Sequence, residues 1–324
     1  MNSILIIVPY FGKFNNYFDL FLKSIEYNET IDFLIITDDR RKFNYPKNCK
    51  VVYSTFKKEA KKITSYFDFE AKCENTYKLC DYRPFLGEIY KEYSKNYDFW
   101  GWCDIDIIFG NIRKFATNDL LTYCDKLYIH GHFSLIKNNG YVNNLLLNSP
   151  IYDDVWHCKE AFLIADHICF YDEFNGSVPT LYRLGAKIYS NICDIANIDY
   201  SYFPFYLCQW DHYTLFKNQK LIFQFKHGQL LGISEAMKQK EFLYIHLQKR
   251  ELENNVSNSD SFMILPNKFL DLDDNFDYKK EWENELINEK LYNNYEQHIN
   301  DKYKNQKFSY FQPKQEVLKM LKKN

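Results

Sequence analysis

Two aspartates separated by one residue, Asp104 and Asp106, form the pattern in this chain that most directly suggests a chemical role. Alternate residues of an extended strand point the same way, so both carboxylates can face one site. Carboxylate oxygens suit Mg²⁺ or Mn²⁺, which keep other coordination positions for water and substrate phosphates. Apolar residues flank the pair on both sides, where unpaired carboxylates would be costly to bury. The pattern predicts a divalent-metal site, and a solvated turn is the alternative.

The segments around this pair resemble a known class of enzymes. Residues 77–84 are Tyr-Lys-Leu-Cys-Asp-Tyr-Arg-Pro, and residues 97–106 are Tyr-Asp-Phe-Trp-Gly-Trp-Cys-Asp-Ile-Asp. Together with Val-Pro-Tyr-Phe-Gly at 8–12 and Thr-Asp-Asp at 37–39, they resemble the GT-A glycosyltransferases with a DXD motif. The closest resemblance is to a poorly characterised bacterial group of surface-polysaccharide loci. It covers residues 3–250, with Trp-Gly-Trp-Cys where the wider class has a Gly-Gly turn.

The resemblance assigns several residues to the nucleotide and the donor sugar. They follow the first two strands or lie just before the DXD strand: Pro9, Tyr10, Phe11, Asp38, Asp39, Lys78, Asp81 and Arg83. The first five are expected to hold base and ribose, because ligands of α/β sheets bind at the carboxyl ends of parallel strands. The alternative for the aspartate pair is a polar turn. For the last three it is a charged helix N-terminus that Asp81 caps.

Two later segments are expected to complete the site. Asp172 and Glu173 lie where the resemblance places acidic residues that face acceptor and donor sugar. An inverting transferase needs a carboxylate base, whereas a retaining one can use the acids to bind hydroxyls. The alternative is an ordinary surface acidic pair.

His246 is expected, by the same resemblance, to be a third metal ligand, which favours Mn²⁺. Lys249 or Arg250 would then neutralise the departing diphosphate. A lone histidine is more often structural, and that reading stays open. The pair His130 and His132 is expected to line the donor or acceptor site, with a partly exposed strand as the alternative.

Buried strands and helices alternate in the first part of the chain. Ile4 to Val8 is a continuous apolar run, typical of a strand covered on both faces. Helical spacing from Tyr17 to Ile25 follows, then apolar runs at 33–37 and 51–53. A helix is expected from Asp81 to Tyr93. With the resemblance, the predicted fold is α/β: a GT-A (Rossmann-like), mostly parallel sheet flanked by helices, with a C-terminal helical extension.

The predicted domain boundary follows residue 267, where the composition shifts to Asn, Lys, Glu, Asp and Tyr. Residues 1–267 would form the GT-A domain and 268–324 the helical extension. The last stretch, 313–324, places Val317, Leu318 and Leu321 on one face among lysines. Such a basic amphipathic helix can lie on an anionic membrane surface. A packed terminal helix is the alternative.

Composition limits the class of partner. Lys plus Arg number 41 and Asp plus Glu 43, a balance that argues against nucleic acid as a main partner. The nine cysteines form no CxxC pair and indicate reduced thiols in the cytoplasm. Peripheral contact with the inner face of the membrane is predicted only through the basic C-terminal helix. No apolar stretch reaches the ~18–20 residues that span a bilayer.

The predicted activity is transfer of a hexose-type sugar from a nucleoside diphosphate donor, with a UDP-sugar favoured. The acceptor would be a hydroxyl of a surface polysaccharide or a lipid-linked glycan, and the cofactor Mn²⁺ or Mg²⁺. One alternative is a nucleotidyl- or phosphotransferase, which also uses paired carboxylates on a metal. The other is a non-catalytic glycan-binding protein.

Overall fold

The structure is a computed structural model that describes residues 1–208, 216–248, 250–272, 276–278, 280, 295, 297, 314, 315 and 318. Lys249 and most of the predicted helical extension lie outside the described residues. Among those that are described, no helix is both long and apolar enough to cross a membrane.

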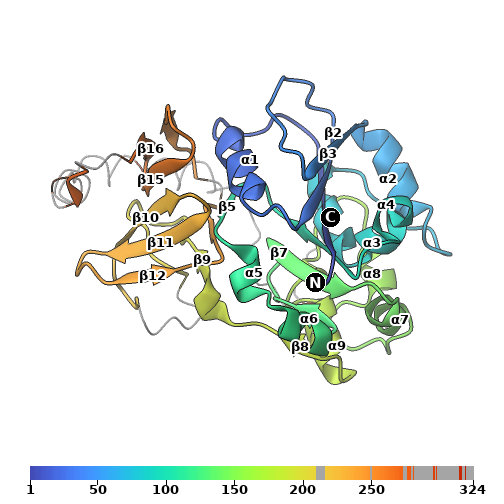
Figure 1. Ribbon diagram of the computed structural model, residues 1–324. Helices are drawn as coiled ribbons and strands as arrows, with labels where there is room; N and C mark the ends of the chain where they lie inside the picture. Colours follow the sequence, from blue (N-terminus) through green and yellow to red (C-terminus); the bar gives the residue numbers. More distant parts are fainter. Residues whose placement is uncertain are drawn as a thin grey trace.

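A seven-stranded sheet with the order β3-β2-β1-β4-β7-β6-β8 forms the centre of the larger half, on the right of Figure 1. Its strands are β1 (Ile4–Tyr10), β2 (Asp32–Thr37), β3 (Cys49–Tyr53), β4 (Phe99–Cys103), β6 (Lys126–Leu127), β7 (Phe133–Lys137) and β8 (Ile188–Tyr189). The neighbours from β3 to β4 are parallel. This part confirms the α/β class and the predicted βαβ start.

Alternate side chains of β1 enter two cores on opposite faces of this sheet. Ile4, Ile6 and Val8 pack with residues of α1 (Phe18–Glu26). Leu5 and Ile7 pack instead with the helices of the other face. The helices that follow along the chain are α2 (Phe56–Thr64), α3 (Leu86–Ile89), α4 (Lys91–Ser94), α5 (Ile112–Phe115), α6 (Asn118–Tyr123), α7 (Tyr141–Leu147), α8 (Cys158–Leu163) and α9 (Ser177–Arg183). A strand covered on both faces must be apolar throughout, as this one is.

The predicted helix from Asp81 to Tyr93 is wrong in detail. The chain instead forms a 3₁₀ stretch, η1 (Thr76–Phe85), followed by the short helices α3 and α4. Pro84 has no N–H to donate to the preceding turn, which favours the break. Arg83 therefore sits on the last turn of η1.

The prediction of a mostly parallel sheet is confirmed, because four of the six neighbouring pairs are parallel: β3–β2, β2–β1, β1–β4 and β6–β8. The exception is one strand. β7 runs antiparallel to both β4 and β6. The link from β6 to β7, residues 128–132, is too short for the crossover that a parallel pair requires. This short link carries the histidines His130 and His132.

A three-stranded sheet with the order β5-β13-β9 lies between the larger half and the rest of the chain (Figure 1). Its strands are β5 (Ile107–Phe109), β9 (Ile195–Asn197), which follows η2 (Ile192–Asp194), and β13 (Tyr244–His246). β13 is antiparallel to β5 and parallel to β9, with His246 opposite both Ile107 and Asn197. Segments about 140 residues apart in sequence therefore meet at one sheet end.

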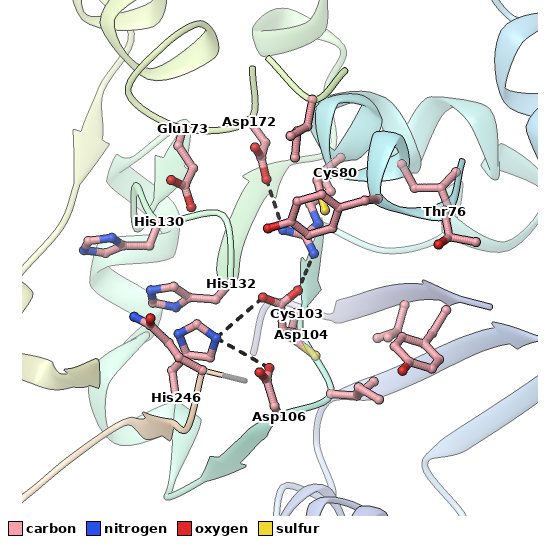
Figure 2. Close-up of a pocket in the computed structure, with 18 of the residues that line it drawn as sticks. Thr76, Cys80, Cys103, Asp104, Asp106, His130, His132, Asp172, Glu173 and His246 are labelled. Carbon is pink, nitrogen blue, oxygen red and sulfur yellow. Dashed lines mark hydrogen bonds and ion pairs between the residues drawn. The ribbon is translucent and has the colours of Figure 1, made fainter. Parts of the chain in front are cut away.

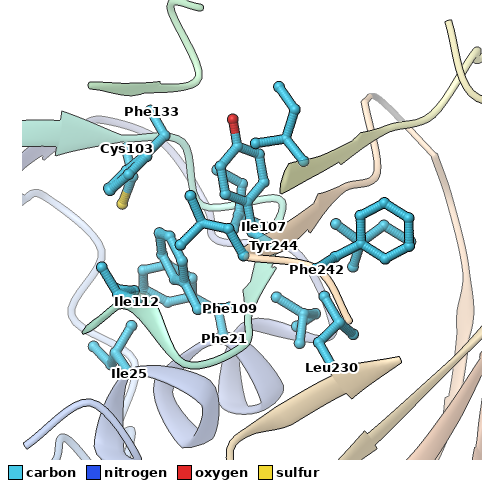
Figure 3. Close-up of a cluster of buried hydrophobic side chains, with 14 of the residues drawn as sticks. Phe21, Ile25, Cys103, Ile107, Phe109, Ile112, Phe133, Leu230, Phe242 and Tyr244 are labelled. Atoms are coloured by element: carbon cyan, nitrogen blue, oxygen red, sulfur yellow. The ribbon is translucent and has the colours of Figure 1, made fainter. Parts of the chain in front are cut away.

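Buried aromatic and aliphatic side chains hold this small sheet in place (Figure 3). Phe109 and Tyr244 face each other edge to face at 5.8 Å, and Phe133 of β7 packs against both. All three are fully buried. The apolar residues after the aspartate pair thus anchor that pair between the two sheets.

A six-stranded sheet, β12-β11-β10-β15-β16-β14, forms the other half, on the left of Figure 1. Its strands are β10 (Leu221–Lys226), β11 (Gln229–Ser234), β12 (Gln239–Glu241), β14 (Glu253–Asn255), β15 (Ser261–Leu265) and β16 (Lys268–Asp271). β16 begins directly after the predicted domain boundary and pairs with β15. The described residues near the C-terminus contact the folded body: Leu318 packs against the second core, and Lys314 pairs with Glu160.

Candidate functional site

Asp104, Asp106 and His246 each offer one ligand atom to a cluster in which these atoms lie within 4.8 Å of one another. The Nε2 atom of His246 lies 3.4 Å from Oδ1 of Asp106 and 3.7 Å from Oδ2 of Asp104. The three side chains converge in Figure 2. Two carboxylate oxygens and one imidazole nitrogen suit a divalent ion of the Mn²⁺ class.

The strands explain why these three side chains meet. Asp104 follows β4 and Asp106 precedes β5, so the pair bridges the large and the small sheet. The backbone N–H of Asp104 donates to the carbonyl of His132, and that of Leu247 donates to the carbonyl of Asp106. Both main-chain contacts fix the aspartates against the elements that carry the histidines.

A cavity of about 1120 Å³ opens at this cluster. It brings together ten of the residues expected to form the site: Pro9, Tyr10, Phe11, Arg83, Asp104, Asp106, Asp172, Glu173, His246 and Arg250. The first three come from the carboxyl end of β1 and the loop after it, as predicted for an α/β ligand site.

Arg83 links the metal cluster to the acidic pair. One arm of its guanidinium donates to Asp104, and the other donates to Asp172 at 3.1 Å and to the carbonyl of Gly131 at 2.8 Å. A planar guanidinium with several fixed donors can make such a bridge, which an ammonium group cannot reproduce. Arg83 therefore sets the spacing of two carboxylates from different elements.

Asp172 and Glu173 lie on the opposite wall from Asp106, as Figure 2 shows. A carboxylate oxygen of Glu173 accepts a hydrogen bond from the backbone N–H of Gly131 at 2.6 Å. Burial raises the pKa of Asp172 well above its usual value and also raises that of Glu173. Both groups are consequently stronger bases than exposed carboxylates.

The electrostatics of the metal cluster reflect its burial. Burial raises the pKa of Asp104, and the neighbouring Arg83 offsets only part of this rise. Burial alone would lower the pKa of His246, but Asp106 and then Asp104 outweigh it, and the pKa lies above the ordinary value. A divalent cation would relieve the repulsion between the two carboxylates.

Lys78 and Asp81 lie outside the cavity wall. Both side chains are fully buried and paired at 2.7 Å. Lys78 also donates to the carbonyls of Ala161 and His167, and Asp81 accepts from the backbone N–H groups of Cys169 and Tyr171. The pair thus holds the segment that leads into Asp172 and has no donor atom left facing the cavity.

Asp38 and Asp39 also lie outside the cavity wall. Asp38 accepts from the backbone N–H of Gly12 at 2.8 Å, and Asp39 accepts from that of Phe14. The side-chain hydrogen bond from Arg41 holds the pKa of Asp39 well below its usual value. The two carboxylates order the loop after β1, which carries the cavity residue Phe11.

Arg250 lines the cavity, but its guanidinium is engaged with main-chain carbonyls. It donates to Phe203 at 2.8 Å and to Tyr202 at 2.7 Å. Burial lowers its pKa to about 10. Arg250 is therefore a fixed positive charge on the wall of the cavity.

The two histidines of the β6–β7 link both line the cavity, which sequence reasoning expected only in general terms. Their rings stack at 4.8 Å, and the ring of His132 also stacks on His246 at 4.2 Å. Asn197 and Gln248 were not foreseen. Both line the cavity beside His246, but a single asparagine or glutamine at a strand end carries no distinguishing sequence signal.

The fold and site define an α/β protein with a candidate divalent-metal site in a large cavity. By sequence the chain belongs to the family of unknown function DUF6625, whose profile matches residues 6–273. A search of curated proteins finds no match.

One solved structure to which the chain is similar is the crystal structure of the glycosyltransferase GlyE of Streptococcus pneumoniae TIGR4. The TM-score is 0.31 and the sequence identity 9%, and the match covers 59% of this chain and 45% of that chain. This chain therefore spans less than half the length of that glycosyltransferase. Such a distant likeness carries no argument about activity, which has to come from the site.

Proposed function

We propose that this protein is a metal-dependent glycosyltransferase that transfers a hexose-type sugar from a nucleoside diphosphate donor, favouring a UDP-sugar. The acceptor would be a hydroxyl of a surface polysaccharide or a lipid-linked glycan. The observation that carries the proposal is the convergence of Asp104, Asp106 and His246 on the wall of a cavity of about 1120 Å³. A cavity of this size exceeds the usual range for one small ligand and suits a donor together with an acceptor.

The metal ion, when bound, would supply a positive charge for the diphosphate oxygens and for the leaving nucleotide. Asp104, Asp106 and His246 would hold it. Arg83 lies directly beside this cluster and adds a second positive charge. Charges fixed before the reaction are worth far more in a partly closed cavity than in water.

The aromatic end of the cavity suits the nucleotide base. Tyr10 and Phe11 line it at the carboxyl end of β1, and Tyr10 is held by a stacking contact with Phe14 at 5.2 Å. Aromatic faces bind a planar base by stacking. Orienting the donor between this end and the metal cluster would fix the sugar near Asp172 and Glu173.

Asp172 and Glu173 are the proposed acceptor-facing acids. In an inverting reaction, a carboxylate oxygen of one of them would take the proton of the acceptor hydroxyl. In a retaining reaction, both would bind hydroxyls and orient the sugars. Their burial and their contacts with Arg83 and Gly131 hold them in fixed positions for either task.

We further propose the cytoplasm, or the inner face of the membrane, as the location of the protein. The nine cysteines, all within the described residues, are free thiols. Free thiols are typical of reducing compartments.

The test is nucleotide release from a panel of nucleoside diphosphate sugars with and without Mn²⁺. We expect slow metal-dependent hydrolysis of one donor, and we expect Asp104→Ala and Asp106→Ala to abolish it while their melting temperatures stay close to wild type. Near-full activity in both variants would overturn the proposal. Stabilisation by UDP only when Mn²⁺ is present provides an independent thermal readout.

A further inference from the structure

The ring of His246 makes a hydrogen bond on the side that faces away from the two aspartates. Its Nδ1 atom lies 3.0 Å from Oδ1 of Asn197. The two residues sit directly opposite each other at the ends of the parallel strands β13 and β9. Both are buried, at 7% and 4% exposure. The side-chain contact therefore joins the ends of two paired strands and is largely buried.

The Asn197 oxygen that faces His246 also accepts a second hydrogen bond. The amide nitrogen of Gln248 donates to the same Oδ1 atom at 2.6 Å. A carbonyl oxygen has two lone pairs and can accept both bonds, whereas an amide nitrogen can only donate. Gln248 reaches this position from a backbone with φ of 38°, in the left-handed region that side chains rarely adopt. The strained residue thus serves to orient the asparagine.

Stacking restricts the imidazole in the remaining direction. The ring of His132 lies 4.2 Å from that of His246, with 29° between the planes. His132 is itself held by a 2.8 Å hydrogen bond between its Nδ1 atom and the hydroxyl of Tyr244. One face of His246 is therefore packed and one edge is hydrogen-bonded, and Nε2 is left facing the two aspartates.

We propose that Asn197 is a positioning residue that fixes His246 in the tautomer with its proton on Nδ1, so that the lone pair of Nε2 is aimed at a cation between Asp104 and Asp106. A neutral imidazole has one N–H and one lone pair, and the partner of one nitrogen decides the state of the other. This inference rests on the metal site of the proposed function. It adds a residue that does not itself touch the ion.

The first test measures metal affinity, without turnover, in the full-length protein. Mn²⁺ is titrated into wild type, Asn197→Leu, Asn197→Asp and Asn48→Leu, with the free ion followed by electron paramagnetic resonance. Asn197→Leu removes the acceptor, and we expect affinity to fall about ten- to hundred-fold, as for other partners of metal-bound histidines. Asn197→Asp keeps an acceptor oxygen and should retain wild-type affinity within about threefold, well short of the ten- to hundred-fold loss.

Asn48→Leu is the control for loss of a half-buried asparagine whose side chain is hydrogen-bonded elsewhere. The side chain of Asn48 donates to the carbonyls of Ile25, Asn28 and Ile31, and it does not line the cavity. We expect this variant to lose stability without losing Mn²⁺ affinity. Asn197→Ala replaces the leucine variant if that one does not fold.

The second test reads the tautomer itself. Nitrogen-15 chemical shifts of the His246 ring are recorded with the diamagnetic ion Zn²⁺ bound, at a pH above the usual imidazole pKa of ~6.5, and assigned with His246→Gln. The ion is needed because the two aspartates by themselves favour a proton on Nε2. We expect a protonated Nδ1 and an unprotonated Nε2 in wild type and Asn197→Asp, and a mixture of tautomers in Asn197→Leu. A purely structural role for Asn197 would leave the ratio unchanged.

The outcomes separate this inference from the proposed function. Normal Mn²⁺ binding with the expected effect of Asn197→Leu, but no turnover of any sugar nucleotide, would remove the transferase and keep the positioning role. A proton on Nε2 in the Zn²⁺-bound wild type, or unchanged Mn²⁺ affinity in Asn197→Leu, would overturn the positioning role alone. A wild-type chain that binds no divalent ion would overturn both.

Discussion

At the scale of single residues, the site depends on side chains that each bind two other side chains from different segments. Arg83 is the clearest case, because it joins a carboxylate of the candidate metal cluster to one of the acidic pair. Removing such a group leaves buried carboxylates without their counter-charge, which costs more than the bond itself. Residue-level changes here should therefore affect geometry and charge together.

Arg83→Lys keeps the positive charge but loses the planar guanidinium with its two terminal donor nitrogens. We expect activity to fall by about a hundredfold or more, the order found when a fixed donor is removed from an active site. A lysine amine cannot bridge Asp104 and Asp172 at once. Steady-state kinetics of the donor hydrolysis should show the loss mainly in kcat. An unchanged kcat would contradict the bridging role.

Lys126 is a second residue with an unusual charge state. It is fully buried, donates to the hydroxyl of Ser134 at 2.7 Å and lies over the ring of Trp102. Burial lowers its pKa to about 7. The unfolded chain keeps its proton to a much higher pH, so between these two pKa values the unfolded state binds more protons and stability rises with pH.

We therefore expect the stability of wild type relative to Lys126→Met to increase from pH 7 upwards to about 10, the ordinary lysine pKa. Methionine fills the same space without a titrating group. Denaturant melts of both proteins across this range give the difference directly. A difference that is constant with pH would show that Lys126 does not change its protonation in this range.

At the scale of elements, the short β6–β7 link lies in close contact with the acidic pair and with Arg83. Gly131 in this link donates to Glu173 and accepts from both Arg83 and Trp102. A Cβ atom placed there would lie 2.4 Å from Glu173 and 2.6 Å from Asp172. The link can approach the acidic pair only because this residue has no side chain.

Gly131→Ala should push the acidic pair away from the cavity. We expect a loss of about 1–3 kcal/mol in stability, as for other overpacked sites. Activity should fall in kcat, whereas Mn²⁺ affinity should stay near wild type because the three candidate ligands lie on other segments. Wild-type kcat in this variant would show that the acids can shift without consequence.

At the scale of the whole molecule, the end of the chain packs back onto the body. Lys314 is buried, donates to both carboxylate oxygens of Glu160 and to the carbonyl of Tyr152, and lies over the ring of Trp156. Leu318 packs against the core behind the seven-stranded sheet. The described part of the predicted membrane-binding face is thus covered by the protein itself.

Lys314→Met should lower the free energy of unfolding by about 2–3 kcal/mol, because one partner of a buried ion pair is left alone. This loss lies at or below the lower end of the ~3–5 kcal/mol for a fully buried pair, because Glu160 is partly exposed. Combining Lys314→Met with Glu160→Gln should cost less than the sum of the two single changes. Strict additivity would mean that the two side chains do not interact in solution.

The sequence alone determined the first strand, the residues at its carboxyl end and the aspartate pair. A continuous apolar run such as that of β1 can be satisfied only inside a sheet covered on both faces, and the polar residues after it must then lie at the sheet edge. The aspartate pair was equally predictable, because two acids between apolar segments need a partner. Local composition contains this information.

The tertiary structure decided which distant segments meet there. His246 and Asn197 become neighbours through the pairing of β13 with β9, and no local pattern encodes that register. Lys78, Asp81, Asp38 and Asp39 carry the same charges in sequence as the cavity residues, yet the fold turns them toward backbone groups. Whether a charged side chain faces a ligand or the main chain depends on long-range packing, which a single sequence does not display.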